Sequence, residues 1–238
     1  MMTTRQPPLK KMFEKVPGRY DLVNRVVTLG LDGKWRRLAV ARCLEQGSDS
    51  ILDLCTGTGD LVVGLARQAS PRTKITAVDF NRPMLEVAKK KARQAGVEER
   101  ILFQVADAAH LPFEDASFDV VGIAFGFRNL TFRNAHRDGH LSEMSRVIKP
   151  LGRLVIVESS QPGSMLAGLG FRFYLRSFVA PVGGLISGER SAYRYLAHSA
   201  ENFYNDKEVE ELLLEAGFSS VETTPLLLGS AAIHVAAR

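Results

Sequence analysis

The chain has 238 residues, of which 45% are hydrophobic and 24% charged, and its formal net charge is +5. This length suits one sizeable hydrophobic core, so we expect a single domain over residues 1–238. No uncharged apolar run is long enough to span a bilayer, and the N-terminal segment lacks the apolar core of a signal peptide, which predicts a cytoplasmic protein. Cys43 and Cys55 are too few for a disulfide framework or a zinc site.

Basic residues outnumber acidic ones and give a pI near 9.3, which would suit binding to nucleic acid or to an anionic membrane surface. The basic residues are dispersed along the chain, and the aromatic residues gather in an apolar segment instead of alternating with basic ones. We therefore expect no nucleic-acid partner, and an RNA-modifying protein is kept only as a minor alternative.

Residues 1–45 precede the first predicted strand and are expected to form N-terminal helices. Pro17-Gly18 breaks any continuous helix, and the apolar positions of residues 33–44 follow a helical period. The preceding aromatic-rich, glycine-punctuated segment is of the kind that forms lids over ligands. Two interpretations stay open: a lid over the ligand, or an arm docked on the domain.

The segment Ile51–Asp60 predicts a buried strand, a tight turn and the start of a helix. Its apolar run ends in small residues with two glycines, Gly57 and Gly59, which let backbone approach a ligand closely. A dinucleotide site would need a third glycine at position 62, where this chain has valine. S-adenosylmethionine (AdoMet) carries no phosphate, and its cationic methionine end favours acids such as Asp53 and Asp60, which bracket the turn.

The spacing Asp53-x-Cys55-x-Gly57-x-Gly59 resembles the AdoMet-binding motif of class I methyltransferases, with Cys55 where Gly or Ala is commoner. The resemblance indicates that this turn binds the cofactor through Asp53, Gly57, Thr58 and Gly59.

Two later predicted strands also end near acids. Asp79 closes the strand Lys74–Asp79, where a carboxylate is placed to accept both ribose hydroxyls of an adenosine. The strand Ile101–Val105 is followed by Asp107-Ala108. Class I methyltransferases place an acid or amide here to hold the adenine amino group, which favours AdoMet over NAD. Asp79, Asp107 and Ala108 complete the predicted cofactor site.

The fourth predicted strand, Phe118–Ala124, leads into the segment Phe125–Asn129. Substrates of open α/β sheets lie outside the carboxyl ends of the strands, so this segment should line the side of the methyl acceptor. Its polar groups are Arg128 and Asn129. On the next helix, His136 and His140 have helical spacing but no carboxylate pattern beside them, so we predict no metal site.

Residues 159–204 interrupt the strand–helix alternation with an apolar, arginine-containing helical segment. It would fit a cap over a hydrophobic acceptor or a face that touches lipid, and burial against the domain or a dimer partner is the alternative. A capping box at Asn205–Glu208 then begins a helix, and two final strands are predicted at 221–224 and 231–236. An antiparallel pair closing a parallel sheet predicts the class I methyltransferase fold: α/β, Rossmann-like, with a mostly parallel seven-stranded sheet and a C-terminal antiparallel hairpin.

Taken together, these segments resemble the family of quinone-biosynthesis C-methyltransferases (UbiE/MenG type), which act on demethylmenaquinone and related ubiquinone precursors. The matching segments are Arg19–Asn24, Trp35–Arg37, Gly57–Asp60, Phe125–Asn129, Arg146–Pro150, Tyr193–Ser199, and Gly229 with His234. The arginine-containing segment after the fourth strand and the tyrosine-rich cap are the specific ones.

The resemblance implies methyl transfer from AdoMet to a ring carbon of a reduced isoprenoid quinone, converting demethylmenaquinol to menaquinol. The alternative is another small or lipid-soluble acceptor, such as a ubiquinone-type benzoquinol. The implied partners are a lipid-soluble quinol and, as open expectations, peripheral contact with the cytoplasmic face of the membrane and a homodimer.

Loss of the hydroxyl proton would make the adjacent ring carbon nucleophilic, and alignment with the methyl donor would carry much of the rate. We expect Asp60 and Tyr20 to organise a water or polarise the hydroxyl, and Arg128 to stabilise the phenolate, since arginine stays protonated.

The chain departs from the family pattern on the acceptor side. Leu31-Asp32 stands where a His usually follows a glycine, and the loop Asn134–Gly139 is unlike the usual one. His198 replaces a usual Glu, and because histidine is a residue type that often acts as a general base, His198 is interpreted as either a base or a solvated cap residue.

Overall fold

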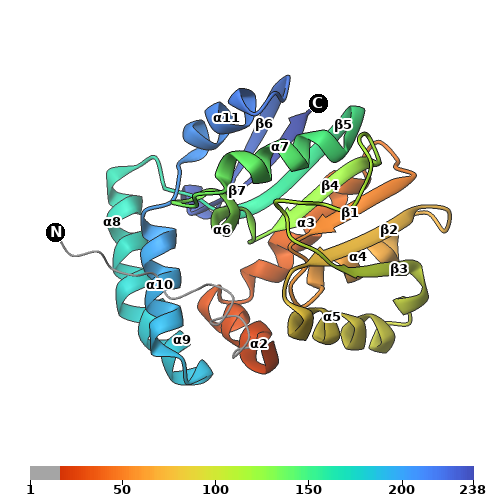
Figure 1. Cartoon of the computed structure of the whole chain (residues 1–238). Helices are drawn as coiled ribbons and strands as arrows, with labels where there is room; N and C mark the ends of the chain where they lie inside the picture. Colours follow the sequence, from red (N-terminus) through yellow and green to blue (C-terminus); the bar gives the residue numbers. More distant parts are fainter. Residues whose placement is uncertain (1–16) are drawn as a thin grey trace.

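A seven-stranded sheet forms the centre of the molecule (Figure 1). The computed structural model describes residues 17–238, with side chains from Asp21 onward. The strands are β1 Ser50–Leu54, β2 Lys74–Asp79, β3 Ile101–Val105, β4 Phe118–Ala124, β5 Ile148–Ser159, β6 Ser220–Leu226 and β7 Ala231–Ala237. Their order is β3-β2-β1-β4-β5-β7-β6, and β7 runs antiparallel to β5 and β6 while the other pairs are parallel. The fold expected from the sequence is confirmed.

Helices cover both faces of this sheet. They are α2 Pro17–Val27, α3 Leu31–Leu44, α4 Asp60–Gln68, α5 Arg82–Gln94, α6 Phe127–Thr131, α7 Arg137–Val147, α8 Met165–Tyr174, α9 Ala180–Ser187, α10 Arg190–Glu201 and α11 Asp206–Glu215. One buried apolar cluster joins α3 and α4 to the sheet, and another joins α6, α7 and α11 to its other face. Strands buried on both faces explain the continuous apolar runs of β1 and β2.

Local sequence signals place the helix starts. Asn81 precedes α5 and its side chain accepts the N–H of Met84, with Pro83 in the first turn. The predicted capping box of α11 is present, because the Asn205 side chain accepts the N–H of Glu208 while the Glu208 side chain accepts the N–H of Asn205. These caps fix where the chain leaves a strand or loop and begins a helix.

A third apolar cluster lies apart from the sheet and joins the N-terminal helix to the helical segment after β5. Val23 and Val27 of α2 pack with Leu175, Val179 and Tyr193. In Figure 1, α8, α9 and α10 form a column beside the sheet, with α2 between them and α5. The described part of the N-terminal segment therefore belongs to the same helical cap as residues 159–204. No helix among the described residues is long and apolar enough to cross a membrane.

Candidate active site

A cavity of about 780 Å³ lies at the carboxyl ends of β1, β2 and β4. Because parallel strands end at one edge of the sheet, residues far apart in sequence meet here. Six of the seven residues predicted to bind the cofactor line this cavity: Asp53, Gly57, Thr58, Asp79, Asp107 and Ala108. We call it the donor cavity.

Gly59, the seventh, acts beneath the cavity and does not line it. It precedes α4 with φ 85, and a Cβ atom there would lie 2.7 Å from the Cβ of Ala88 on α5. Cys55 and Gly57 also have left-handed backbone, with φ 59 and 54. A turn with three such residues brings backbone N–H groups to the cavity, and at Cys55 an L side chain tolerates a conformation that usually favours glycine.

Asp53 carries a buried carboxylate, and one of its two oxygens accepts no hydrogen bond. Its side chain is 1% exposed, and the Thr56 hydroxyl donates to Oδ2 at 2.5 Å. Oδ1 is buried without a hydrogen-bond partner. Burial raises the pKa of Asp53 from its usual 3.8 to about 7. An orphaned acceptor of this kind at a cavity wall fits a cationic donor group.

Asp79 is tied to the glycine turn. Its Oδ2 accepts the N–H of Gly57 at 2.9 Å and its Oδ1 the N–H of Asn81 at 2.8 Å. Burial raises the pKa of Asp79 above its usual range. A carboxylate accepts about four hydrogen bonds, so capacity remains for a ligand's hydroxyls.

Asp107 and Phe80 frame the far part of the donor cavity. Asp107 is exposed, and its Oδ1 accepts the N–H of Ala109 at 2.9 Å. Phe80 lines the same cavity and keeps 40% of its surface exposed, which leaves a ring face for stacking. Sequence analysis did not single out Phe80; the only signal was an aromatic residue directly after the acid that ends β2.

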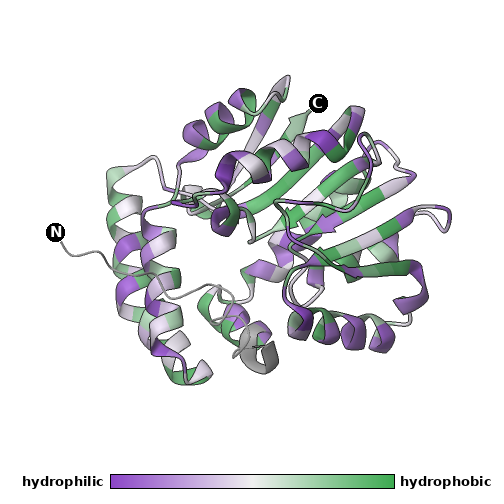
Figure 2. Cartoon of the chain, in the orientation of Figure 1, coloured by the Kyte–Doolittle hydropathy of each residue, from purple (hydrophilic) through white to green (hydrophobic). Residues whose placement is uncertain are grey.

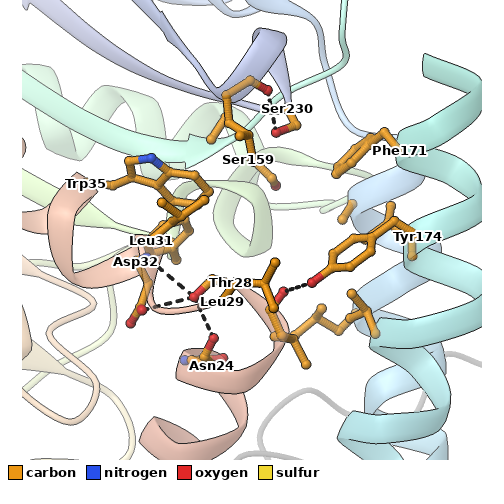
Figure 3. A pocket seen from close by; sticks show the side chains of 18 of the residues that line it. Asn24, Thr28, Leu29, Leu31, Asp32, Trp35, Ser159, Phe171, Tyr174 and Ser230 are labelled. Carbon is orange, nitrogen blue, oxygen red and sulfur yellow. Dashed lines mark hydrogen bonds between the residues drawn. The ribbon is translucent and has the colours of Figure 1, made fainter. Parts of the chain in front are cut away.

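A second cavity, of about 460 Å³ and mostly apolar, lies between the cap and the ends of β4 and β5. Figure 3 shows Trp35 and Thr28 on one side of it, and Phe171 and Tyr174 of α8 on the other. Both cavities are lined by three common residues: Arg36, Phe125 and Asn129. The two cavities therefore adjoin at these residues, and we call the second one the acceptor cavity.

Arg128 presents a buried guanidinium to the acceptor cavity. Its side chain donates from Nη1 to the Ser159 hydroxyl at 2.6 Å, and Nη1 lies 3.5 Å from Oε1 of Glu158. The backbone N–H of Arg128 also donates to Glu158, at 3.1 Å. Its Nε is buried and has no partner. The guanidinium is thus held in place through Nη1, and its buried Nε has no hydrogen-bond partner within the protein.

Tyr195 lines the same cavity and was named in the sequence only as part of a motif. Burial raises the pKa of Tyr195, while the positive charge of Arg128 lowers it. A phenol and a guanidinium therefore share one apolar cavity.

Asp60 lines the donor cavity but is already engaged by two cations. It pairs with Lys91 and, at 3.5 Å, with Arg36. Lys91 also lies 2.8 Å from Asp21 of α2, whose Oδ1 accepts the Thr58 hydroxyl at 2.6 Å. Asp60 is thus paired with two cations, and this arrangement suits a role in fixing Arg36 and Lys91 beside the donor cavity.

Arg36 stands at the junction of the cavities. It pairs with Asp32 at 2.5 Å, its guanidinium carbon lies 5.1 Å from the ring centre of Phe125, and the Thr28 hydroxyl donates to Asp32 at 2.9 Å. Asp32, a departure from the family pattern, is thus a buried partner of Arg36.

The remaining predicted groups divide clearly. The backbone of Tyr20 lies in α2, but its side chain is outside the described residues, so its expected role stays a prediction. His198 is exposed and does not line either cavity, which agrees with a solvated cap residue and removes the basis for a catalytic one.

His140 is buried and its Nδ1 lies 2.9 Å from the carbonyl oxygen of Leu130. Among the described residues no three ligating side chains gather into a metal site.

Comparison with known proteins gives one family. A model of the ubiE/COQ5 methyltransferase family matches residues 1–238. A demethylmenaquinone methyltransferase of Thermus thermophilus is 45% identical over 95% of this chain and 100% of its own length. The enzyme of the same name from Thermotoga maritima is 40% identical, with 94% and 93% covered. A ubiquinone/menaquinone biosynthesis C-methyltransferase of Desulfotalea psychrophila is 37% identical, with 96% and 89% covered.

Solved structures share the fold at low sequence identity. An O-methyltransferase family protein of Burkholderia thailandensis has a TM-score of 0.66 and 14% identity, covering 92% of this chain and 59% of that one. A phosphoethanolamine N-methyltransferase of Haemonchus contortus, solved with S-adenosyl-L-methionine, has a TM-score of 0.57 and 21% identity, covering 80% and 38%.

Proposed function

The chain belongs to the ubiE/COQ5 methyltransferase family, and we propose that it methylates a ring carbon of a reduced isoprenoid naphthoquinone, converting demethylmenaquinol to menaquinol. It is an AdoMet-dependent methyltransferase. The observation that carries the proposal is the junction of a polar donor cavity and an apolar acceptor cavity at Arg36, Phe125 and Asn129. The relatives named demethylmenaquinone methyltransferase support this acceptor.

The donor cavity fits AdoMet on its own chemistry. When bound, AdoMet supplies an electrophilic methyl group on a sulfonium. The orphaned Oδ1 of Asp53 would accept from the methionine ammonium, and Asp79 from the ribose hydroxyls. Asp107 and Ala108 would hold the adenine, with Phe80 stacking on it. Gly57 and Thr58 provide the close backbone wall, and Gly59 sets the packing beneath them.

On the acceptor side, Arg128 stabilises the charge that develops when the quinol hydroxyl loses its proton. Its free Nε donates to that oxygen, and Glu158 and Ser159 hold the guanidinium in place. A fixed cation in an apolar cavity favours the phenolate, and the phenolate makes the neighbouring ring carbon nucleophilic. That carbon would bond to the methyl group as the methyl–sulfur bond breaks, and the C–H proton of the same ring carbon would then be lost to water, which restores the aromatic ring.

The proton from the hydroxyl passes to a water that Tyr20 of α2 orients. Asp60 contributes through Arg36 and Lys91, which its carboxylate keeps fixed beside the donor. Arg36 packs on Phe125 at the junction, so it aligns the wall through which the methyl group passes. No metal is needed for these steps.

The partner is a lipid-soluble quinol, for which the mostly apolar lining of the acceptor cavity is suited. Cytoplasmic location with peripheral contact at the membrane face, a homodimer and the lack of a nucleic-acid partner belong to the same proposal. A ubiquinone-type benzoquinol is the second candidate, favoured by the relative whose name covers both quinones.

The test is transfer of labelled methyl from AdoMet to reduced demethylmenaquinone, with a benzoquinol precursor and bulk RNA as parallel acceptors. Label in the naphthoquinol supports the proposal, and label in the benzoquinol alone favours the second candidate. Label in RNA, or in none of the three while AdoMet still binds, contradicts the assignment of the acceptor.

A further inference from the structure

We propose that an apolar surface at the mouth of the acceptor cavity docks on an anionic lipid bilayer, so that the quinol passes from the bilayer straight into the cavity. The inference rests on the proposed function, because it takes the acceptor to be lipid-soluble. We call this surface the docking face. It consists of exposed apolar side chains from three segments: Leu29, then Met165, Leu166, Leu169 and Phe173 of α8, and Leu227 with Leu228.

Helix α8 is apolar on two sides at once. At 100° per residue, its exposed residues Met165, Leu166, Leu169 and Phe173 fall on one side. Phe171 and Tyr174 line the acceptor cavity from another side. A surface helix ordinarily turns its apolar stripe inward and polar residues outward. Figure 2 shows hydrophobic residues along α8 at the outer edge of the molecule, and within residues 17–238 no element covers this outward apolar face.

Three leucines mark the mouth of the cavity, and all three have left-handed backbone. Leu29, Leu227 and Leu228 have φ 53, 42 and 56, and each lines the acceptor cavity. Leu29 is 72% and Leu228 83% exposed. Glycine or asparagine ordinarily occupies such positions. Both the backbone conformation and the contact with water disfavour leucine here, so an apolar partner outside the protein accounts for these residues.

Two of the three segments of the docking face, α8 and the pair Leu227 and Leu228, lie close together. Leu227 and Leu228 belong to the short 3-10 turn Leu227–Gly229. A Cβ atom on Gly229 would lie 3.3 Å from the Cα of Pro162, in the segment that leads into α8. The turn therefore lies against the start of α8, and the cavity opens between them.

Charge and access favour a bilayer over a second copy of the chain. Residues 159–188 contain Arg172 and Arg176 and no acidic residue, although Arg176 pairs with Glu201 at the edge of the cap. Basic side chains beside an apolar face suit anionic lipid. A second copy seated on this face would close the mouth formed by Leu29 and Leu228, whereas a bilayer holds the acceptor there.

The first test is flotation with equimolar phosphatidylcholine and phosphatidylglycerol vesicles. Leu228→Asn removes an apolar side chain and suits the left-handed backbone, so it should weaken vesicle binding by about tenfold without lowering the melting temperature. Leu151→Asn is the matched control: Leu151 is 92% exposed with φ 66, but it lies near the start of β5, at the opposite end of the sheet from the cavities. It should bind vesicles like the wild type. Equal loss in both variants, or no binding by the wild type, overturns the inference.

The second test separates docking from chemistry. Leu169 and Phe173 do not line the acceptor cavity, so Leu169→Gln/Phe173→Gln should slow methylation of a long-tailed quinol in vesicles and leave that of a tail-less naphthoquinol in solution unchanged. Vesicle binding without methylation of either quinol supports the docking face and contradicts the proposed function. Methylation without vesicle binding supports the proposed function and contradicts the docking face. A wild-type dimer that this double variant dissociates, with no vesicle binding, assigns the face to a second copy and overturns the inference.

Discussion

Replacing Arg128 by glutamine should slow methyl transfer while leaving AdoMet binding intact. Arg128 is 8% exposed, it lines the acceptor cavity and not the donor cavity, and its Nε has no hydrogen-bond partner within the protein. Loss of one fixed donor to a developing oxyanion costs about 2.7–4 kcal/mol, or about 100-fold to 1,000-fold in kcat. Glu158 would lose its cation, so Arg128→Gln/Glu158→Gln serves as the stability-matched variant.

The pH profile distinguishes this role from a structural one. The guanidinium favours the phenolate and so lowers the pKa of the bound quinol; without it that pKa rises, and the ascending limb of kcat moves to higher pH. A difference of about 2.7 kcal/mol corresponds to about 2 pH units. Single-turnover rates from about pH 6 to about pH 10, with AdoMet affinity measured by calorimetry, make the comparison. If the folded Arg128→Gln variant kept the wild-type kcat, and if the ascending part of its pH profile stayed at the same pH, the role of Arg128 would be refuted.

Three further predictions concern the donor cavity. Gly59→Ala would place a Cβ 2.7 Å from the Cβ of Ala88 and should lower the free energy of unfolding, measured in urea, by about 2–4 kcal/mol. The control Gly47→Ala, at φ 70 with open space around it, should lower it by only about 1–2 kcal/mol. Equal losses in the two variants would contradict the packing role of Gly59. Burial raises the pKa of Asp53 from 3.8 to about 7, so the folded ligand-free protein holds the proton longer than the unfolded chain and should lose unfolding free energy as pH rises from about 4 to about 7. Ionised Asp53 attracts the cationic methionine end, so AdoMet affinity should rise as pH passes through about 7. Asp53→Asn should flatten the slope of unfolding free energy and remove that rise in affinity, and an unchanged slope in urea titrations would show that Asp53 is not responsible. Phe80→Ala should weaken AdoMet binding by about 5-fold to 150-fold in calorimetry through lost stacking on adenine, and an unchanged Kd would place the adenine elsewhere.

The donor side of the site was predictable from sequence because its residues follow strand ends. Asp53, Asp79 and Asp107 each come at or just after the end of a predicted strand, and the carboxyl ends of parallel strands meet at one edge. Local signals of this kind, like the capping box at Asn205, depend on neighbours in sequence. They can therefore be recognised without knowledge of the tertiary structure.

The acceptor side could not be assembled in the same way. Arg36 meets Asp60 and Phe125 only because α3 packs beside α4 and the end of β4, and no local pattern records those distances. The engagement of Asp60 by Lys91 likewise depends on the packing of α4 against α5. A single sequence shows residue types, but not which long-range pairs neutralise each other.

The cap shows a similar limit. The pattern of residues 159–204 predicted helices, and helices are present there, while their role as a cap over the acceptor stays a prediction. That α2 shares their core through Val23 and Val27 was not evident, because an N-terminal segment has several surfaces to which it can dock. The left-handed backbone of Leu228 was equally hidden, since leucine is not a residue that predicts such a turn.

The most direct test of the account is to supply AdoMet with a deuterated methyl group together with reduced demethylmenaquinone, and to locate the label in the product by NMR and mass spectrometry. Methyl transfer across the junction of the two cavities predicts a deuterated methyl group on the ring carbon beside a hydroxyl. A deuterated methyl ether on the oxygen would contradict the assigned chemistry. Unlabelled quinol with AdoMet still bound would contradict the acceptor assigned to the second cavity.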